Sequence, residues 1–580
     1  MSAPARPATA GAAPPVTGAP DLWCTYAAVR TLAWLGRAGR TPHRAATVGY
    51  VIGRRNADGG YAWSRGMPSD AWATFYCVAT LADLGEPPPR REQTAVWTRS
   101  TWSGEAYAMT SGQRPDVWAT HFATRTAVEL LGEDVPDRAA LLAWLRRLQT
   151  RAGGLSWSPE HAEAGDADAR ACFYGVAAWR ALASLEPVDP PWDVPALVGW
   201  LRERQGPEGG FTFAPDADVP CLWATYRATG ALAALGARPA ADVTPFVLGQ
   251  RLDDGAFTRW PGYPVADVWA SFSAVGALRA TAGEVPPGVA AAVERRLAEL
   301  ACAEGGFTYR EPEAAADALT VSAAALVAAP HAPELPEWRA WLEGCRLPNE
   351  DGVMYMPGRG AEVRCTLWAL AAGAFRDDPA GSGAVSAWLT RLQNPDGGFG
   401  YWHGRGSDLV STASAVEIRR LVGRAGDPPL DLRALGAFVD ACDRSPDGQD
   451  GHGNVPGGPA ALRSGLQAAR VLDFLGRTER PAVARLLDRH RVPGGGWANQ
   501  GARLPDLLST YEAVATADRL GIRVDPDHLR AFVDRTGSER GAAWSPLAPP
   551  TDDPLATCLH RLLRRRLATP AGRLPALSLS

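Results

Sequence analysis

The segment Asp267-Val-Trp-Ala-Ser-Phe272 decides the fold, because its pattern recurs along the whole chain. A typical copy has an Asp, two variable residues, a small residue, a Thr or Ser, and then an apolar run of helical period. Successive copies begin 45 to 53 residues apart, and a period in this range indicates a repeat architecture. The twelve copies begin at Asp21, Asp70, Asp116, Asp168, Cys221, Asp267, Asp317, Glu362, Asp408, Ala461, Asp506 and Asp553.

The Asp that opens a copy is predicted to cap a helix, since its carboxylate can accept hydrogen bonds from the unpaired N–H groups of the first turn. A second helix follows each capped one, as at 139–149 and 384–393, apolar at helical spacing with Arg facing outward. A turn with paired Gly and an aromatic residue comes next, as at 205–211 and 393–399, and paired Gly suits the end of a helix. Alternating β-branched residues are almost absent. We therefore predict an all-α protein built from helical hairpins.

Composition places the chain among soluble globular proteins, with 46% hydrophobic and 21% charged residues. A net charge of −4 gives no basic surface for nucleic acid, and no apolar run is long enough to span a bilayer. Residues 1–20 lack the apolar core of a signal peptide and are predicted to form a disordered arm. The nine Cys are scattered, which favours reduced thiols and a cytoplasmic location.

The sequence Gln, spacer, Asp-Gly-Gly-Phe, followed by a capped Thr/Ser helix, resembles the terpene cyclase and protein prenyltransferase β-subunit superfamily. The resemblance extends from Asp21 to about Ala568. In that family six hairpins close into an α/α barrel. Twelve inner helices therefore imply two consecutive α6–α6 barrels, similar to those of class II terpene cyclases, the relatives of squalene-hopene cyclase.

Aromatic residues separate the first six repeats from the last six. Two residues after the cap, the first six repeats carry Trp23, Trp72, Trp118, Arg170, Trp223 and Trp269, and five residues after it they carry Tyr26, Phe75, His121, Phe173, Tyr226 and Phe272. The later repeats lack this pattern, so we predict an aromatic-rich barrel at 21–303 and a second barrel at 304–580. The repeats begin and end with an inner helix, which leaves eleven outer helices for twelve places.

The two aromatic positions are three residues apart and share a helix face. Aromatic faces stabilise cations, so a lining of this kind suits the carbocation of a terpene cyclase. These twelve side chains are our candidate substrate-binding residues. The alternative is that the rings pack the barrel axis or an interface between barrels. Arg170, with Asp166 and Asp168 nearby, could hold a diphosphate or simply form an ion pair.

The resemblance also implies where an acid should lie. Class II cyclases protonate an alkene or epoxide with the middle Asp of an Asp-x-Asp-Asp-Thr motif, at the second inner helix of the second barrel. Counting repeats places this motif on Glu362-Val-Arg-Cys-Thr366, where Arg364 replaces the middle Asp. Arg stays protonated and is a very weak acid. We therefore expect any proton donor to be Glu362, Asp317 or Asp408, each of which is also explained as a helix cap.

The prenyltransferase branch binds catalytic zinc through Asp-x-Cys at an inner-helix start and a later His. Here the Asp-x-Cys sequence is Asp440-Ala-Cys442, which falls at the end of an outer helix. The loop that follows could bind a divalent cation through Asp443, Asp447 and Asp450, or could be an ordinary solvated turn. We predict no resident metal.

Three functions remain open. The first is a cyclase that departs from the family's acid motif and acts on a linear isoprenoid in an aromatic-lined barrel cavity. The second is a catalytically silent barrel that binds an isoprenoid, a lipid or a peptide. The third and weaker alternative is a prenyltransferase. No cofactor is expected, although Mg²⁺ could take part if the substrate is a diphosphate. The expected partner is a small isoprenoid, with no nucleic acid, and peripheral membrane contact stays open.

Overall fold

The computed structural model describes residues 20–63, 68–263, 266–309, 317–347, 350–355, 360–424, 426–448, 450–538, 541–551, 553–569 and 572–579. The arm predicted at 1–20 lies outside the described residues, apart from Pro20. The secondary-structure elements of the described part are all helices except for one two-stranded sheet, β1 (Gly537–Ser538) with β2 (Gly541–Ala542). The all-α prediction is therefore confirmed. Contacts within the chain divide it into two compact units, which hold the described residues 20–309 and 317–579.

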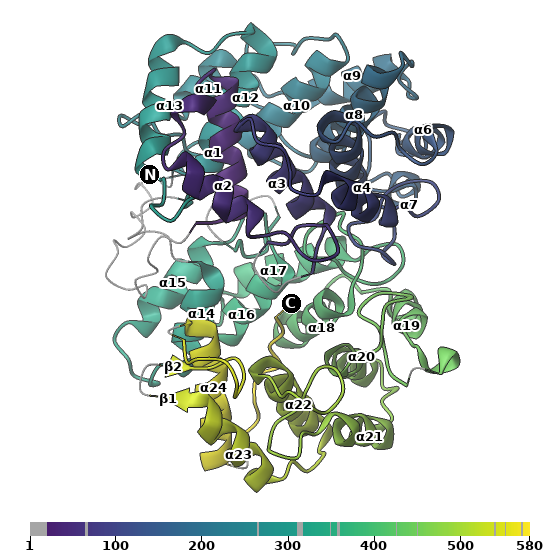
Figure 1. Cartoon of the computed structure of the whole chain (residues 1–580), viewed down its shortest axis with the longest axis vertical. Coiled ribbons are helices and arrows are strands. Elements are labelled where there is room, and N and C mark those ends of the chain that lie inside the picture. The colour runs from purple at the N-terminus through teal and green to yellow at the C-terminus, as the bar shows by residue number, and fades with distance from the viewer. Residues whose placement is uncertain are drawn as a thin grey trace. The chain divides into compact units, whose positions relative to one another are not determined.

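The first unit is a ring of six inner helices (Figure 1). Each inner helix packs against the next, and the last packs against the first. The inner helices are α1 (Leu22–Trp34), α3 (Ala71–Asp83), α5 (Val117–Arg125), α8 (Ala169–Leu185), α10 (Leu222–Ala234) and α12 (Val268–Ala282). The outer helices are α2 (Arg44–Ile52), α4 (Arg91–Ser100), α6 (Arg138–Arg146), α9 (Val194–Glu203), α11 (Thr244–Gly249) and α13 (Pro287–Glu299). Short helical turns lie at η1 (Ala38–Arg40), η2 (Thr126–Leu130) and α7 (Pro159–Glu163).

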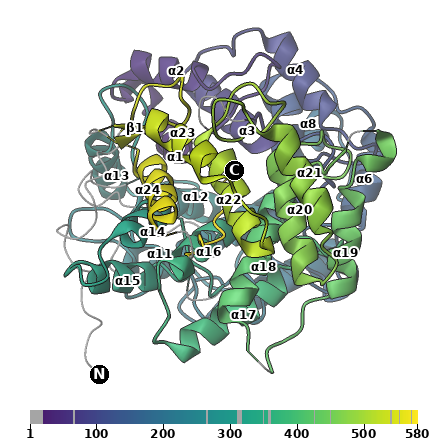
Figure 2. The ribbon, with the colours of Figure 1, turned by 90° about the horizontal axis from the view of Figure 1, so that it is seen from below.

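The second unit is also a closed ring of six inner helices (Figure 2). They are α14 (Ala318–Val327), α16 (Val363–Ala371), α18 (Leu409–Val422), α20 (Leu462–Phe474), α22 (Leu507–Leu520) and α24 (Pro554–Ala568). The outer helices within the described residues are α15 (Leu335–Gly344), α17 (Pro379–Leu392), α19 (Leu432–Ala441), α21 (Arg480–His490) and α23 (Pro526–Thr536), and a short turn, η4 (Ser445–Asp447), follows α19. As predicted, the described chain thus supplies eleven outer helices.

The repeat motif performs two structural tasks. Nine of its Asp residues accept a hydrogen bond from a backbone N–H in the first turn of the helix they precede, which confirms the cap prediction. The Thr of the motif anchors the preceding glycine turn, because its hydroxyl oxygen accepts the N–H of the aromatic residue in that turn. Tyr61 N bonds Thr74 Oγ1 at 3.0 Å, and Phe399 N bonds Thr412 Oγ1 at 3.0 Å.

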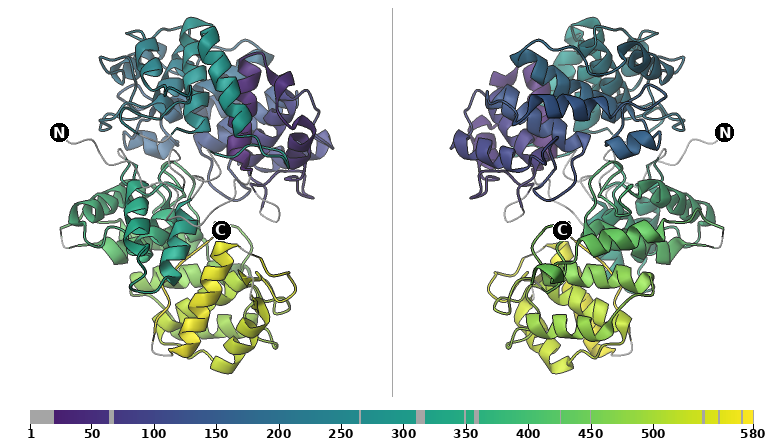
Figure 3. Two further views of the ribbon diagram at one scale, coloured as in Figure 1. Left: turned by 90° about the vertical axis from the view of Figure 1, so that its left-hand side faces the viewer. Right: turned by 90° about the vertical axis from the view of Figure 1, so that its right-hand side faces the viewer.

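The same Thr contact closes the first ring. Phe307 N donates to Thr25 Oγ1 at 3.0 Å, and Asp21 N donates to Phe307 O at 3.0 Å. Figure 3 shows the teal helices at the end of this unit lying beside the purple helices at its start. Gly305 makes the turn with a φ of +99°, and a Cβ there would lie 2.3 Å from the carbonyl of Ala46 on α2. Residues 304–309 therefore pack with the first unit, although the expected second barrel began at 304.

Candidate functional site

The aromatic positions of the first unit face one another inside the ring. Trp23 stacks on Trp269 with ring centroids 4.4 Å apart, and Tyr26 stacks on Tyr76 at 4.0 Å. Rings from helices that are not neighbours also meet. The ring centroids of Tyr76 on α3 and Trp269 on α12 lie 6.2 Å apart, although α1 separates these two helices. The five Trp residues two positions after the cap are all buried, and so are Tyr26, Phe75, His121 and Phe272, whereas Phe173 and Tyr226 are half-buried. The described rings thus pack on one another along the axis, and ligand contact by them stays a prediction.

Two further positions per repeat also line the axis, and the sequence analysis missed them. Six residues after the cap stand Tyr76, Phe122, Tyr174 and Arg227 in the first unit, and Trp368, Gln467 and Glu512 in the second. Nine residues after it stand Arg30, Arg125, Glu417 and Arg470. Extending the helical period beyond the first two positions would have found both sets, because residues 2, 5, 6 and 9 share one helix face.

Arg227 is a cation enclosed by aromatic rings. Its guanidinium carbon lies 4.5 Å from the Trp223 ring centroid, 5.6 Å from Tyr174 and 5.8 Å from Tyr226. The residue is only 4% exposed. It donates to Tyr174 Oη at 3.1 Å and to the Trp223 carbonyl at 3.3 Å, and no carboxylate within the described residues forms an ion pair with it. The interior of this unit therefore holds a positive charge with π-faces in place of a counter-ion.

The polar exceptions at the aromatic positions have structural partners. Arg170 forms a buried forked ion pair with Asp168, with Nε–Oδ1 at 3.0 Å and Nη2–Oδ2 at 2.8 Å, so the ion-pair alternative is confirmed. Its guanidinium also lies 4.4 Å from the centroid of Phe213. His121 is buried, and burial together with the charges of Arg125 and Arg227 holds its pKa well below the usual range. His121 is therefore neutral near pH 7.

Glu362 lies at the start of α16, in the place that the resemblance assigns to the acid motif. Its carboxylate accepts from Arg364 Nε at 2.5 Å and from Cys365 Sγ at 2.7 Å, and its side chain makes no cap bond to the backbone of α16. Burial and the nearby carboxylate hold the pKa of Cys365 well above its usual range, so the thiol keeps its proton. Both carboxylate oxygens of Glu362 therefore bond side chains of α16, and its role as an acid stays a prediction.

Asp317 and Asp408 lie at the starts of α14 and α18, the helices on either side of α16. Each carboxylate caps its helix through the backbone N–H and the hydroxyl of the third residue of that helix: Asp408 accepts from Ser411 N at 2.8 Å and from Ser411 Oγ at 3.1 Å. Burial raises the pKa of both carboxyls, and that of Asp408 rises to about 6. Burial raises the pKa of Asp267, a cap in the first unit, to about 6 as well. The raised pKa of these three caps thus follows from the burial of their carboxyl groups.

The axis of the second unit is polar where that of the first is aromatic. Glu512 on α22 accepts from Arg463 Nη2 at 3.1 Å, Gln467 Nε2 at 3.0 Å and Arg470 Nη2 at 3.0 Å, all on α20. Arg470 and Glu512 are fully buried. Two guanidinium groups against one carboxylate leave one excess positive charge at this place.

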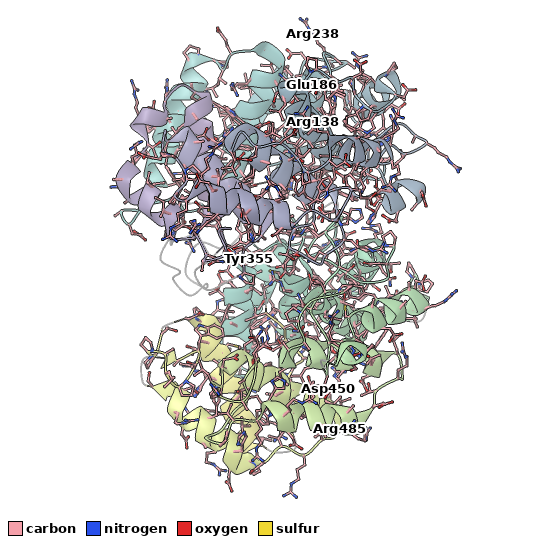
Figure 4. The ribbon with its side chains drawn as sticks, turned by 45° about the vertical axis from the view of Figure 1, so that its right-hand side comes forward. Arg138, Glu186, Arg238, Tyr355, Asp450 and Arg485 are labelled. Carbon is pink, nitrogen blue, oxygen red and sulfur yellow. The ribbon has the colours of Figure 1, made fainter. Side chains whose placement is uncertain are left out.

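The described residues do not form a metal centre. No group of three or more His, Cys, Asp or Glu side chains there is arranged to hold an ion. In the Asp440-Ala-Cys442 sequence, Asp440 is exposed and pairs with Arg477, whereas burial raises the pKa of the Cys442 thiol to about 12, so these two residues do not fit a zinc site. In the loop after α19, Asp450, which is labelled in Figure 4, pairs with Arg489 at 2.9 Å. The Asp447 side chain lies outside the described residues.

Comparisons with known proteins found relatives in sequence and similar solved structures. One curated relative, a drimenyl diphosphate synthase from Streptomyces showdoensis, is 32% identical over 212 residues, and the match covers 33% of this chain and 38% of that protein. Among solved structures, an ent-copalyl diphosphate synthase from Streptomyces platensis is 19% identical over 95% of each chain, with a TM-score of 0.38. A protein geranylgeranyltransferase-I from Candida albicans, complexed with GGPP, is 16% identical over 45% of this chain and 87% of that one, with a TM-score of 0.36.

Within the described residues, none of the helices has the length and apolarity needed to cross a membrane.

The family model described as the prenyltransferase alpha-alpha toroid domain matches residues 62–247, 195–353 and 320–461. These matches together span more than half of the sequence and both units. The chain belongs to the prenyltransferase alpha-alpha toroid domain family.

Proposed function

We propose that this protein is a terpene cyclase-like enzyme that acts on a linear isoprenoid and uses Asp408 as its proton donor. The observation that carries the proposal is the buried Asp408 carboxyl at the start of α18, whose pKa lies at about 6. A carboxyl with this pKa is about one-tenth protonated at pH 7, whereas an ordinary Asp is protonated far less. General acids work best when their pKa lies near the working pH.

The chemistry would begin at one carbon–carbon double bond of the isoprenoid. The O–H bond of Asp408 breaks as the π electrons form a new C–H bond, which leaves a carboxylate on the protein and a carbocation on the substrate. A second double bond then attacks the cation and closes a ring. Loss of a proton from the cyclised cation to a base ends the reaction.

Two further observations support an isoprenoid substrate. The relative that is 32% identical over 212 residues is a drimenyl diphosphate synthase, which makes an isoprenyl diphosphate a reasonable substrate class. The enclosure of Arg227 by rings shows that an aromatic interior in this protein tolerates a positive charge without a nearby carboxylate. If the substrate carries a diphosphate, we expect Mg²⁺ to accompany it.

The second candidate function is a catalytically silent isoprenoid-binding or peptide-binding barrel. The Glu362–Arg364 ion pair favours it, because an Arg stands where the family's acid would be and neutralises the neighbouring carboxylate. This candidate predicts ligand binding without turnover.

The test is an incubation of the purified full chain with farnesyl diphosphate, geranylgeranyl diphosphate, squalene and oxidosqualene, with and without Mg²⁺, followed by mass spectrometry. We expect a cyclised product from one of these substrates. Asp408→Asn should lower its formation by at least about 100-fold, because Asn can still cap the helix but cannot donate a proton.

Asp267→Asn is the matched control, since it changes the same kind of cap with the same raised pKa in the other unit. It should leave turnover unchanged. Full activity in Asp408→Asn would place the acid elsewhere. Intact substrates throughout, in a folded sample, would favour the silent barrel.

A further inference from the structure

The residues that follow α24 return into the second unit. We call 572–579 the axial segment. Three of its backbone carbonyls accept hydrogen bonds from side chains of the inner helices. Pro575 O accepts from Tyr511 Oη at 2.8 Å, Ala576 O accepts from Arg470 Nη1 at 3.3 Å, and Ser578 O accepts from Trp368 Nε1 at 3.1 Å. Arg463 also donates to Leu579 O. Side chains of the inner helices thus bind this segment mainly through its backbone.

These bonds place the axial segment inside the ring of inner helices. Trp368 on α16 and Arg470 on α20 both bond Ser578, the former at its carbonyl and the latter at its hydroxyl at 3.0 Å, although α18 stands between the two helices. Leu577 is 1% exposed and Ser578 is 0% exposed. In Figure 2 the chain after α24 lies among the inner helices of this unit.

The segment runs antiparallel to α20 and makes one γ-turn, in which Leu577 N donates to Pro575 O at 2.9 Å. Arg470 bonds Ala576 and Arg463 bonds Leu579, so the register moves toward the start of α20 as the segment proceeds. Two helical turns separate the arginines, roughly 10 Å along the axis. Three residues of chain can span roughly the same length. The spacing of the arginines therefore matches the stretch from Ala576 to Leu579.

Small side chains make room for the segment. Five residues after the cap, the first unit has an aromatic ring or His121 in every repeat, whereas the second unit has Ser322, Ala413 and Cys558 in three of its six repeats. Rings from the helices fill the first axis. In the second unit, the filling comes from residues outside the hairpin repeats, and the six inner helices close their ring without it.

We propose that the axis of the second unit is a binding channel for a peptide, which the chain fills reversibly with its own residues 572–579. Carbonyl recognition by Trp368, Arg463, Arg470 and Tyr511 gives the channel its affinity for a backbone. The excess positive charge of the Arg463–Arg470–Glu512 cluster suits carbonyl oxygens. Burial of Leu577 and Leu579 adds apolar contact.

The test uses a chain that ends at Thr569 and a fluorescein-labelled synthetic peptide that spans residues 572–580, with binding followed by fluorescence anisotropy. We expect saturable binding to the shortened chain and at least ten times weaker binding to the full chain, whose channel is occupied. Replacing both Leu577 and Leu579 by Ser in the peptide should weaken binding at least tenfold. Equal binding to both chains, or no binding to a folded shortened chain, would overturn the proposal.

Single variants of the shortened chain test the recognition itself. Trp368→Phe and Tyr511→Phe keep an aromatic ring but lose the donor to the peptide carbonyl, so each should weaken binding about fivefold. Trp388→Phe on the outer helix α17 is the matched control and should leave the affinity unchanged. If Trp368→Phe and Tyr511→Phe bind the peptide as tightly as the shortened chain without a substitution, backbone recognition by these donors is refuted.

A second route serves if the shortened chain does not fold. A protease site inserted after Thr569 allows the full chain to fold before it is cut. We expect the cut segment to remain bound and then to exchange with excess labelled peptide while the protein stays folded. A cut segment that never exchanges would show that residues 572–579 are permanent core, and the proposal would fail.

Discussion

The carboxylate of Glu512 lies 3.0 Å from the guanidinium of Arg470, and both side chains are fully buried on the axis of the second unit. Arg463 shares the same carboxylate. Buried charges of this kind are tolerated only while each one keeps its partner, because an unpaired buried ion lowers the free energy of unfolding by several kcal/mol.

Glu512→Gln should therefore destabilise the second unit by about 3–5 kcal/mol, since two guanidinium groups would lose their counter-ion. Denaturant unfolding followed by circular dichroism measures the change. Asp440→Asn, which breaks the exposed pair with Arg477, is the control and should cost less than about 1 kcal/mol. A similar small loss in both variants would contradict the importance of the buried pair.

Trp269→Ala should destabilise the first unit by about 3–5 kcal/mol, because the ring is buried and stacks on Trp23. Trp269→Phe should lose less, since a ring remains. Chemical denaturation of both variants gives the comparison. If Trp269→Ala instead retained full stability and lost only isoprenoid binding, the ring would be a ligand contact rather than a packing element.

Stability should depend on pH through Asp267. Its pKa in the folded state, about 6, exceeds the ordinary value of 3.8, so the folded protein binds the proton more tightly than the unfolded chain. This stabilisation is complete below about pH 4 and is lost as the pH rises through about 6. The advantage of wild type over Asp267→Asn should therefore shrink across this window, as measured by thermal unfolding at each pH. An advantage that grew with pH would show that the sign is wrong.

Turnover should require the protonated form of Asp408 and should therefore fall as the pH rises. We expect the rate of product formation to fall about tenfold per pH unit above pH 6, because the acid form disappears as the pH rises through its pKa of about 6. A pH–rate profile from 5 to 8 measures this. A rate that rose with pH would identify a base-limited reaction and exclude this acid.

Gly305→Ala should destabilise the first unit by about 2 kcal/mol or more, because the residue adopts a left-handed conformation and a Cβ would meet the backbone of α2. Gly288→Ala on α13 is the control, since a Cβ there has open space around it, and it should be neutral or slightly stabilising. Thermal unfolding compares the two. Equal melting temperatures would show that the turn can relax.

The repeat pattern was enough to predict the hairpins, the caps and the eleven outer helices, because each depends on local signals a few residues apart. The candidate site was harder to predict. Trp269 and Tyr26 were identified on the correct face, but the contact between their rings depends on helices far apart in sequence. Arg227 and Arg470 were missed because the helical period was followed over two positions only, and the axial segment was missed because no local motif shows that residues 572–579 return to the centre of a ring.

The hydrogen bond from Asp21 N to Phe307 O joins the entrance and the exit of the first unit. Because the two ends of this unit are in contact, its chain could begin at another loop and still close the same ring. A circular permutant of the first unit would link residue 309 to residue 20 through a short flexible linker and would begin and end in the loop at 132–134. It should form the same hairpins, connected in a different order along the chain. The order in which the repeats are written in the chain is therefore separable from the shape that they build.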